Sequence, residues 1–126
     1  MNEMSKIINR FFQLNVQAKL FHWNTIPHKG IQVAEDIQSA ILNLTDVFMK
    51  EYIAIYGRRM IKEPYNTIKL TIMTERCMVL YLKKSKEFVE NELLKYIDEE
   101  KDLVLLKTSK DLSIVLTAAL CCLTNE

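Results

Sequence analysis

Glycine and proline are both scarce in this chain of 126 residues, which contains two of each. An average protein has about 7% glycine and about 5% proline, and these residues mark turns and interrupt helices. So few interruptions favour long helices over an architecture of strands and turns. We therefore expect an all-α fold, built as a single domain over residues 1–126.

Long apolar runs, an excess of one charge and a secretory signal are also missing from the sequence. No run approaches the roughly 18 apolar residues that span a bilayer, so no membrane segment is expected. The 17 basic and 16 acidic residues leave a net charge of +1, which argues against nucleic acid as a partner. The three cysteines, an odd number without a signal peptide, are expected to be reduced thiols of a cytosolic or nuclear protein, and we expect a cytoplasmic location.

The motifs of several common enzyme classes are absent. The sequence has no glycine-rich phosphate loop, no Gly-x-Ser-x-Gly elbow, no Cys-x-x-Cys pair and no His-Glu-x-x-His motif. The enzyme classes that depend on these motifs are therefore not indicated by the sequence. Whether the chain is an enzyme stays open at this point, and a non-catalytic role is favoured.

Apolar residues recur at spacings of three and four in the first half of the chain, the spacing of one helix face. The first such stretch covers about residues 3–24 and ends before Pro27, which disfavours helical geometry at the preceding residue. The second begins after Gly30 and stops at Gly57, where glycine can take the left-handed capping conformation. We expect two helices here, the second about 40 Å long.

A linker over residues 58–73 separates these helices from two more. Its alternating Ile68, Leu70 and Ile72 fit either a short extended piece or a helical turn. The helix after it carries apolar residues at helical spacing and a strongly charged middle, which is expected to face water.

The third helix is expected to start at a Thr74 cap and to continue to Ile97. The fourth is expected over residues 101–124, with a new start near Thr108 as an alternative. Its end is almost wholly apolar, so we expect it to be buried on more than one side.

The stretch from Lys19 to Thr25, KLFHWNT, places a histidine and the only tryptophan at the end of the first expected helix. It resembles the end of the first helix in ferritin-like proteins of the Dps branch. The resemblance continues through acidic positions to Tyr56-Gly57-Arg58 and covers about residues 14–58. A similar order is found in short ferritin-like proteins of large DNA viruses, for which the location would be the host cytoplasm. The resemblance implies an antiparallel four-helix bundle with a long connection between the second and third helices.

In Dps-like proteins a histidine of the first helix is an iron ligand, and the second helix carries four ligand positions. The first-helix histidine corresponds to His22. Matched on their spacing, the four later positions fall on Ile31, Glu35, Asp46 and Lys50. Two of the four are therefore not ligands. The resemblance assigns the histidine and the two acids as the remaining metal-binding residues.

Glu35 and Asp46 are eleven residues apart, about 16 Å along one helix, so one copy cannot bring both to the same ion. The resemblance implies a homodimer, or a larger homo-oligomer, in which two copies of this helix cross near Ser39 and Ala40. His22 and its neighbouring glutamate in one copy would then face the aspartate and the lysine of the other.

The lysine decides how this site is interpreted. Lys50 brings a positive charge to a ligand position, where it repels a metal ion. Its ammonium group can instead pair with Asp46 one turn earlier or with Glu35 across the dimer. We therefore expect a degenerate site in which ion pairs replace metal, with no cofactor and a non-catalytic binding or scaffold role. The alternative is an iron-binding mini-ferritin with ferroxidase activity, in which iron or zinc is bound and His28 or Asp36 adds a ligand.

Four further side chains have a structural interpretation. Phe21 and Trp23 are expected to be core residues, because large aromatic side chains at helical spacing usually pack inside. Cys121 and Cys122 lie on an apolar helix end and are expected to be small core residues as well.

Overall fold

The computed structural model describes residues 3–24, 31–56 and 69–124. These residues form four long helices, α1 (Glu3–Asn24), α2 (Ile31–Tyr56), α3 (Glu75–Glu87) and α4 (Leu103–Thr124). Two shorter helical turns, η2 (Phe88–Glu92) and η3 (Leu93–Tyr96), continue α3. The described part of the chain contains helices and no strand, which confirms the all-α expectation.

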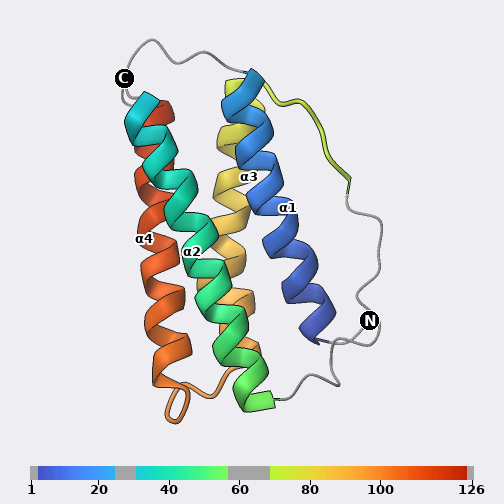
Figure 1. Ribbon diagram of the computed structural model, residues 1–126, viewed down its shortest axis with the longest axis vertical. Coiled ribbons are helices and arrows are strands. Elements are labelled where there is room, and N and C mark those ends of the chain that lie inside the picture. The colour runs from blue at the N-terminus through green and yellow to red at the C-terminus, as the bar shows by residue number, and fades with distance from the viewer. Residues whose placement is uncertain (1–2, 25–30, 57–68, 125–126) are drawn as a thin grey trace.

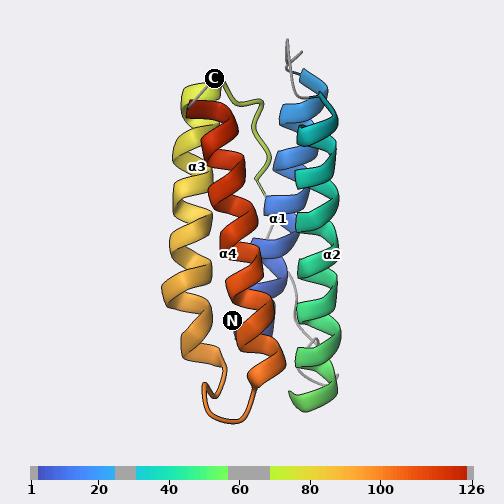
Figure 2. The ribbon, with the colours of Figure 1, turned by 90° about the vertical axis from the view of Figure 1, so that its left-hand side faces the viewer.

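The four long helices lie side by side as a bundle (Figures 1 and 2). α4 packs closely against α2 and α3, α1 packs against α2, and α1 and α3 make the weakest contact of these pairs. α1 and α2 run in opposite directions, because Asn15 lies beside Thr45 and His22 lies beside Glu35. α2 ends and α3 begins at opposite ends of the bundle (Figure 1).

The core is one apolar cluster to which every helix contributes. An aromatic column runs through it, in which Phe11 meets Phe48 edge to face and Phe48, Tyr52 and Tyr56 follow at one-turn spacing along α2. Burial of such rings contributes strongly to the stability of the fold, since each removes about 150–250 Å² from water. The most deeply buried apolar side chains are Ile7, Phe48, Tyr52, Leu93, Leu105, Leu112 and Leu116.

α3 begins as its sequence predicts but does not stay regular. The Thr74 side chain accepts a hydrogen bond from the Cys77 N–H at 3.2 Å, the capping contact that satisfies a free donor of the first turn. The charged side chains of its middle face water as expected, with Lys86 half-buried, but Ser85, Phe88 and Val89 between them are buried. A π-helical turn at η2 adds one residue to the turn and so changes which side chains face the core.

On the same side of the bundle, Tyr81 and Phe88 pack near Arg10 of α1. The Arg10 guanidinium lies 5.0 Å from the centroid of the Phe88 ring. Burial raises the pKa of Tyr81 to about 12, and the Ser85 hydrogen bond and the Arg10 charge act in the opposite direction. Tyr81 is therefore a neutral core phenol at physiological pH.

α4 is continuous from Leu103 to Thr124, so the alternative of a new start near Thr108 is wrong. The Thr108 hydroxyl donates to the carbonyl oxygen of Val104 at 2.9 Å and so does not cap a helix. The expectation that the apolar end is buried on more than one side is also wrong. One face of the helix packs on the core there, and the opposite face is open to solvent, with Ile114 66% exposed.

The turn between η3 and α4 is closed by hydrogen bonds to two aspartates. Asp98 accepts from the backbone N–H groups of Glu100 and Lys101. Asp102 accepts from the Asp98 N–H at 2.9 Å and from the Tyr56 hydroxyl at 2.6 Å. The turn is thereby tied to the last residue of α2, and we call this region the Asp102 end of the bundle.

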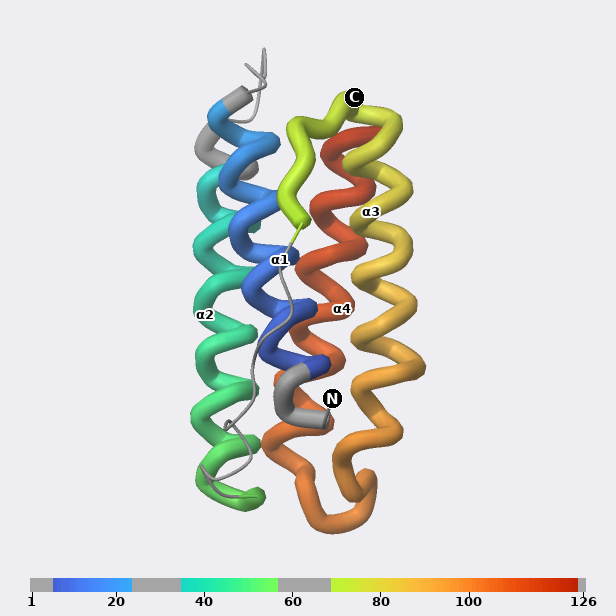
Figure 3. The backbone as a smooth tube through the Cα atoms, turned by 90° about the vertical axis from the view of Figure 1, so that its right-hand side faces the viewer, coloured from blue at the N-terminus to red at the C-terminus, as the bar shows by residue number. Residues whose placement is uncertain are grey.

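Only the last part of the predicted linker lies within the described residues. Residues 69–73 are not helical and run beside α1 (Figure 3), so this part of the linker is the extended alternative. Among the described residues, no helix has the length and apolar character needed to cross a membrane.

Candidate functional site

His22 and Glu35 face each other where α1 ends and α2 begins, a region that we call the His22 end of the bundle. The Nε2 atom of His22 lies 4.0 Å from Oε1 of Glu35. His22 is half-buried and Glu35 is exposed. The separation is at the outer limit for an ion pair and too long for a direct hydrogen bond, so the two groups are neighbours without being locked together.

Asp46 and Lys50 form a separate pair farther along α2. The Lys50 Nζ atom lies 3.0 Å from Oδ2 of Asp46, and both side chains are exposed. This is the one-turn pairing that the spacing allows. Within one copy, the structure therefore brings His22 to Glu35 and Lys50 to Asp46, but it does not bring the two pairs together.

The other residues assigned from the sequence have mixed outcomes. Asp36 is exposed at the start of α2. Ser39 is exposed and Ala40 is half-buried, because adjacent residues point about 100° apart around a helix. Ile31 begins α2, but its side chain lies outside the described residues, as does all of His28.

Three of the residues expected in the core are on the surface. Trp23 is 69% exposed, with the Lys19 Nζ atom 5.6 Å from its ring centroid. Cys121 and Cys122 are exposed as well. Phe21 is partly buried against the core, so the predicted core position is partly correct for this residue. The apolar stripe of α1 is wider than the surface that its neighbours cover.

The exposed apolar side chains of α1 and α2 form one surface. Phe12, Val16 and Trp23 of α1 are exposed at spacings of four and seven, which places them on one helix face. Leu42 of α2 is 60% exposed.

The two helices meet at a hydrogen bond of 3.0 Å between the Asn15 amide and the Thr45 hydroxyl. Phe12 and Val16 lie within one turn of Asn15, and Leu42 lies within one turn of Thr45. These apolar side chains therefore flank the same seam on its solvent side. Figure 1 looks onto this pair of helices, whose outer surface we call the α1–α2 face.

The charged residues assigned from the sequence lie at the same surface. Glu35, Ser39, Leu42 and Asp46 follow one another at spacings of four, three and four, and so share one stripe of α2. An apolar patch bordered by opposite charges is typical of a protein–protein contact surface.

The donors that the structure describes in one copy do not by themselves make up a metal centre. Iron and zinc sites need three or more imidazole, carboxylate or thiolate donors around one point. Among the described residues, no three such side chains converge in this way. His22 and Glu35 supply two donors, and Lys50 directs a positive charge at the carboxylate that would supply a third.

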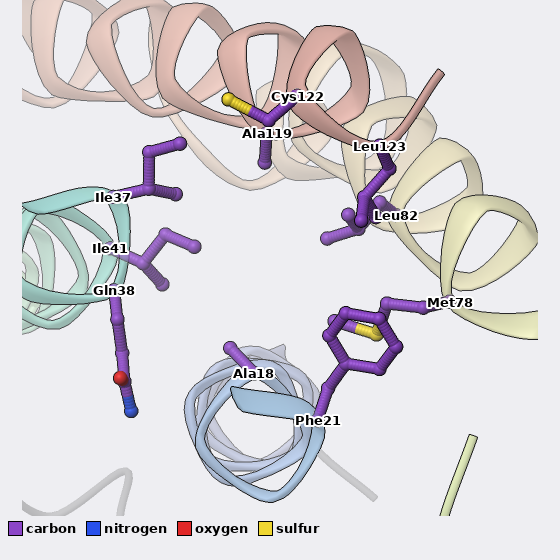
Figure 4. A pocket seen from close by; sticks show the side chains of 10 residues that line it. All are labelled: Ala18, Phe21, Ile37, Gln38, Ile41, Met78, Leu82, Ala119, Cys122 and Leu123. Atoms are coloured by element: carbon purple, nitrogen blue, oxygen red, sulfur yellow. The ribbon is translucent and has the colours of Figure 1, made fainter. Parts of the chain in front are cut away.

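A small apolar cavity opens at the His22 end, between all four helices (Figure 4). Its volume is about 90 Å³. Small residues on facing helices, Ala18 and Ala119, leave space between Ile41, Met78 and Leu123, whereas the amide of Gln38 is directed away from its centre. Sequence reasoning missed this cavity, since helical spacing does not reveal which small residues face one another.

Sequence reasoning also missed the role of Asp102. The residue is only 8% exposed, and the hydrogen bond from the Tyr56 hydroxyl, followed by that from the Asp98 N–H, holds the pKa of its carboxyl group below the ordinary range. The sequence contains a cluster of acids here, but the partner on α2 is 46 residues away. This carboxylate is a structural acceptor at the end opposite to His22.

Comparison of the chain with protein-family models, with curated proteins and with solved structures finds no match.

Proposed function

We propose that this protein is a ferritin-like, Dps-like homo-oligomer that acts by binding or as a scaffold and not by catalysis. Its α1–α2 face is the self-association surface, and ion pairs occupy the place of an intersubunit metal site. The observation that carries the proposal is the exposure of Phe12, Trp23 and Leu42 on the α1–α2 face, beside the charges of Glu35 and Asp46.

The arrangement of the helices supports the ferritin-like part of the proposal. α1 and α2 run in opposite directions, and α2 ends at the far end of the bundle from the start of α3. A chain arranged in this way needs a long connection between its second and third helices, which is the feature of ferritin-like bundles.

Symmetry defines the contact. If Glu35 of one copy lies opposite Asp46 of the other across a two-fold axis, Leu42 of each copy lies opposite Ser39 of its partner. A large exposed apolar side chain then meets a small one, which permits close approach of the two α2 helices. Lys50 comes within a turn of the partner's Glu35, so each copy offers an acid and a base to the other.

The charges favour ion pairs over a metal ion at this seam. A unit charge at 4 Å in a medium of effective dielectric about 20 interacts with another by about 4 kcal/mol, and a divalent ion doubles this value. Lys50 would oppose a cation by an energy of this order. In the absence of the cation, the same ammonium group neutralises Asp46, from which it lies 3.0 Å away.

One observation favours the second candidate function, an iron-binding mini-ferritin. His22 and Glu35 are the two donor types that such sites use, and they already face each other in one copy at 4.0 Å. Measurement of metal content in protein purified without chelator separates the two candidates. Our proposal expects far less than one metal ion per chain, whereas stoichiometric iron or zinc that is lost on His22→Ala or Asp46→Ala would establish the second candidate.

Self-association is tested by a charge placed at the seam. Leu42→Glu should disrupt the contact at the α1–α2 face and lower the mass of the oligomer at micromolar concentration, as measured by light scattering, because a carboxylate would be buried against the partner. Ile114→Glu on α4 is the matched control, since Ile114 is 66% exposed and Leu42 is 60% exposed. Equal masses for the two variants, or a monomeric unmodified protein, would contradict the proposal.

A further inference from the structure

Two glutamines of α1 hold the extended segment 69–73. The Gln17 amide donates to the carbonyl oxygen of Thr71 at 2.8 Å and accepts from the Thr71 N–H at 2.7 Å. The Gln13 amide donates to the carbonyl oxygen of Lys69 at 3.1 Å. Gln17 is 1% exposed, so its two bonds are protected from water. The segment is therefore bound through its backbone, next to α1 (Figure 3).

The spacing of these bonds fixes how the segment is oriented. Gln13 and Gln17 are one turn apart, about 6 Å along α1. Two residues of extended chain cover about 6.6 Å, so one helical turn matches every second residue of the segment. In an extended chain, the N–H and C=O groups of successive residues point to opposite sides. Because Lys69 and Thr71 face α1, the backbone groups of Leu70 and Ile72 face away from it.

The side of the segment that faces away from α1 is an unpaired strand edge. The backbone groups of Leu70 and Ile72 make no hydrogen bond to any part of the chain that the structure describes. Their residues are 48% and 69% exposed. An exposed edge with unpaired N–H and C=O groups and apolar side chains is a template for the addition of another strand.

We propose that this edge pairs with the same segment of a second copy, antiparallel and centred on Thr71. Leu70 and Ile72 flank Thr71 symmetrically. Leu70 of each copy therefore forms a hydrogen-bonded pair with Ile72 of the other copy. A two-fold arrangement of this kind gives four backbone hydrogen bonds. It also places Leu70 beside the partner's Ile72 on one face, an apolar cross-strand pair.

Charge supports the same register. With Thr71 opposite its own copy, Lys69 lies opposite Met73 of the second molecule, two residues before Glu75, the exposed first residue of α3. A lysine side chain is long and flexible, so Lys69 of one copy can approach Glu75 of the other, and the opposite charges attract. Each copy therefore offers a lysine to the glutamate of the other copy.

This contact is separate from the α1–α2 face and does not depend on it. Gln13 and Gln17 lie on a different side of α1 from the stripe of Phe12 and Val16, because adjacent residues are about 100° apart around the helix. Two different two-fold contacts on one chain join pairs into larger assemblies. The edge would therefore connect the proposed dimers to one another.

Disulfide trapping tests the register. In a background with Cys77, Cys121 and Cys122 replaced by serine, all three being exposed, Thr71→Cys places two thiols directly opposite each other. Facing residues of a pair that is not hydrogen-bonded have Cα atoms about 4.5 Å apart, within the range of a disulfide. Mild oxidation should convert most of the Thr71→Cys protein to a covalent dimer.

Lys69→Cys in the same background is the matched control. In the proposed register its two copies are four residues apart, about 13 Å, which is too far for a disulfide. At least tenfold less cross-linking is expected than for Thr71→Cys. No cross-link at residue 71, or equal cross-linking at residues 69 and 71, would overturn the proposal.

A backbone variant gives a second readout. Ile72→Pro removes one N–H of the unpaired edge and leaves the Thr71 bonds to Gln17 in place, so it should abolish cross-linking at residue 71 without loss of helical circular dichroism. Cross-linking that persists in Ile72→Pro would contradict strand pairing. Leu42→Glu should leave the cross-link intact, which distinguishes failure of this contact from failure of the proposed α1–α2 dimer.

Discussion

At the Asp102 end of the bundle, polar groups on different elements are paired, whereas at the His22 end apolar side chains surround a cavity. The Tyr56 hydroxyl joins α2 to the turn before α4 through Asp102 at 2.6 Å. At the other end, His22 and Glu35 stand 4.0 Å apart beside a cavity of about 90 Å³. The comparison shows that one end is joined across elements by hydrogen bonds, while the other leaves space between its apolar side chains.

Truncation in the aromatic column should have the largest effect on stability. Phe48→Ala removes a fully buried ring that contacts both Phe11 and Tyr52. We expect the free energy of unfolding to fall by about 3–5 kcal/mol. Urea unfolding measures it, with Ile114→Ala as an exposed control that should change by about 0.5 kcal/mol or less. If Phe48→Ala lowers the free energy of unfolding no more than Ile114→Ala does, the aromatic column does not contribute strongly to the stability of the core.

Adding volume should have opposite effects at the two ends. Ala119→Val puts methyl groups next to the cavity and should stabilise the protein by about 0.5–2 kcal/mol. Leu105→Phe adds volume at a fully buried site of α4 near the Asp102 end and should destabilise it by about 1–3 kcal/mol. Thermal unfolding compares them. Destabilisation by both variants would mean that the His22 end is as tightly packed as the other.

The smallest of these effects depends on pH and belongs to the Asp102 end. The pKa of Asp102 is lowered on folding, chiefly by the Tyr56 hydrogen bond. Its contribution is therefore fully present above the unfolded pKa, near pH 4, and is lost as the pH falls through the lower folded pKa.

Asp102→Asn should lower stability at neutral pH and reduce the loss of stability on acidification below about pH 4. Tyr56→Phe should do the same to a lesser degree, because the Asp98 N–H remains as a donor. Urea midpoints measured from pH 7 to pH 2 check both variants. An acid profile for Asp102→Asn identical to that of the unmodified protein would contradict this account.

The sequence predicted the helices well because their signals are local. Apolar spacing and the positions of Pro27 and Gly57 bound the first two helices, and the Thr74 cap forms as expected. Exposure was predicted less well. Helical spacing shows that a stripe exists, but the neighbouring helices determine how much of it is covered. Trp23 and Cys121 are therefore exposed on stripes that also contain core residues.

Contacts between distant residues could not be predicted in this way. The partner of Asp102 is a tyrosine on α2, and the segment around Thr71 is held by a glutamine 54 residues earlier. The alternating Ile68, Leu70 and Ile72 left two conformations open, and the glutamines of α1 select the extended one. For the candidate site, spacing predicted that Lys50 can pair with Asp46, while the intersubunit contact stays a prediction.

A charge exchange across the seam tests the central claim most directly. The dissociation constant of the homodimer would be measured by sedimentation for the unmodified protein, Glu35→Lys, Lys50→Glu and the double variant. If Glu35 of one copy lies near Lys50 of the other, each single variant should weaken the dimer by about tenfold or more, and the double variant should recover most of this loss. A double variant no tighter than the single ones would contradict the account.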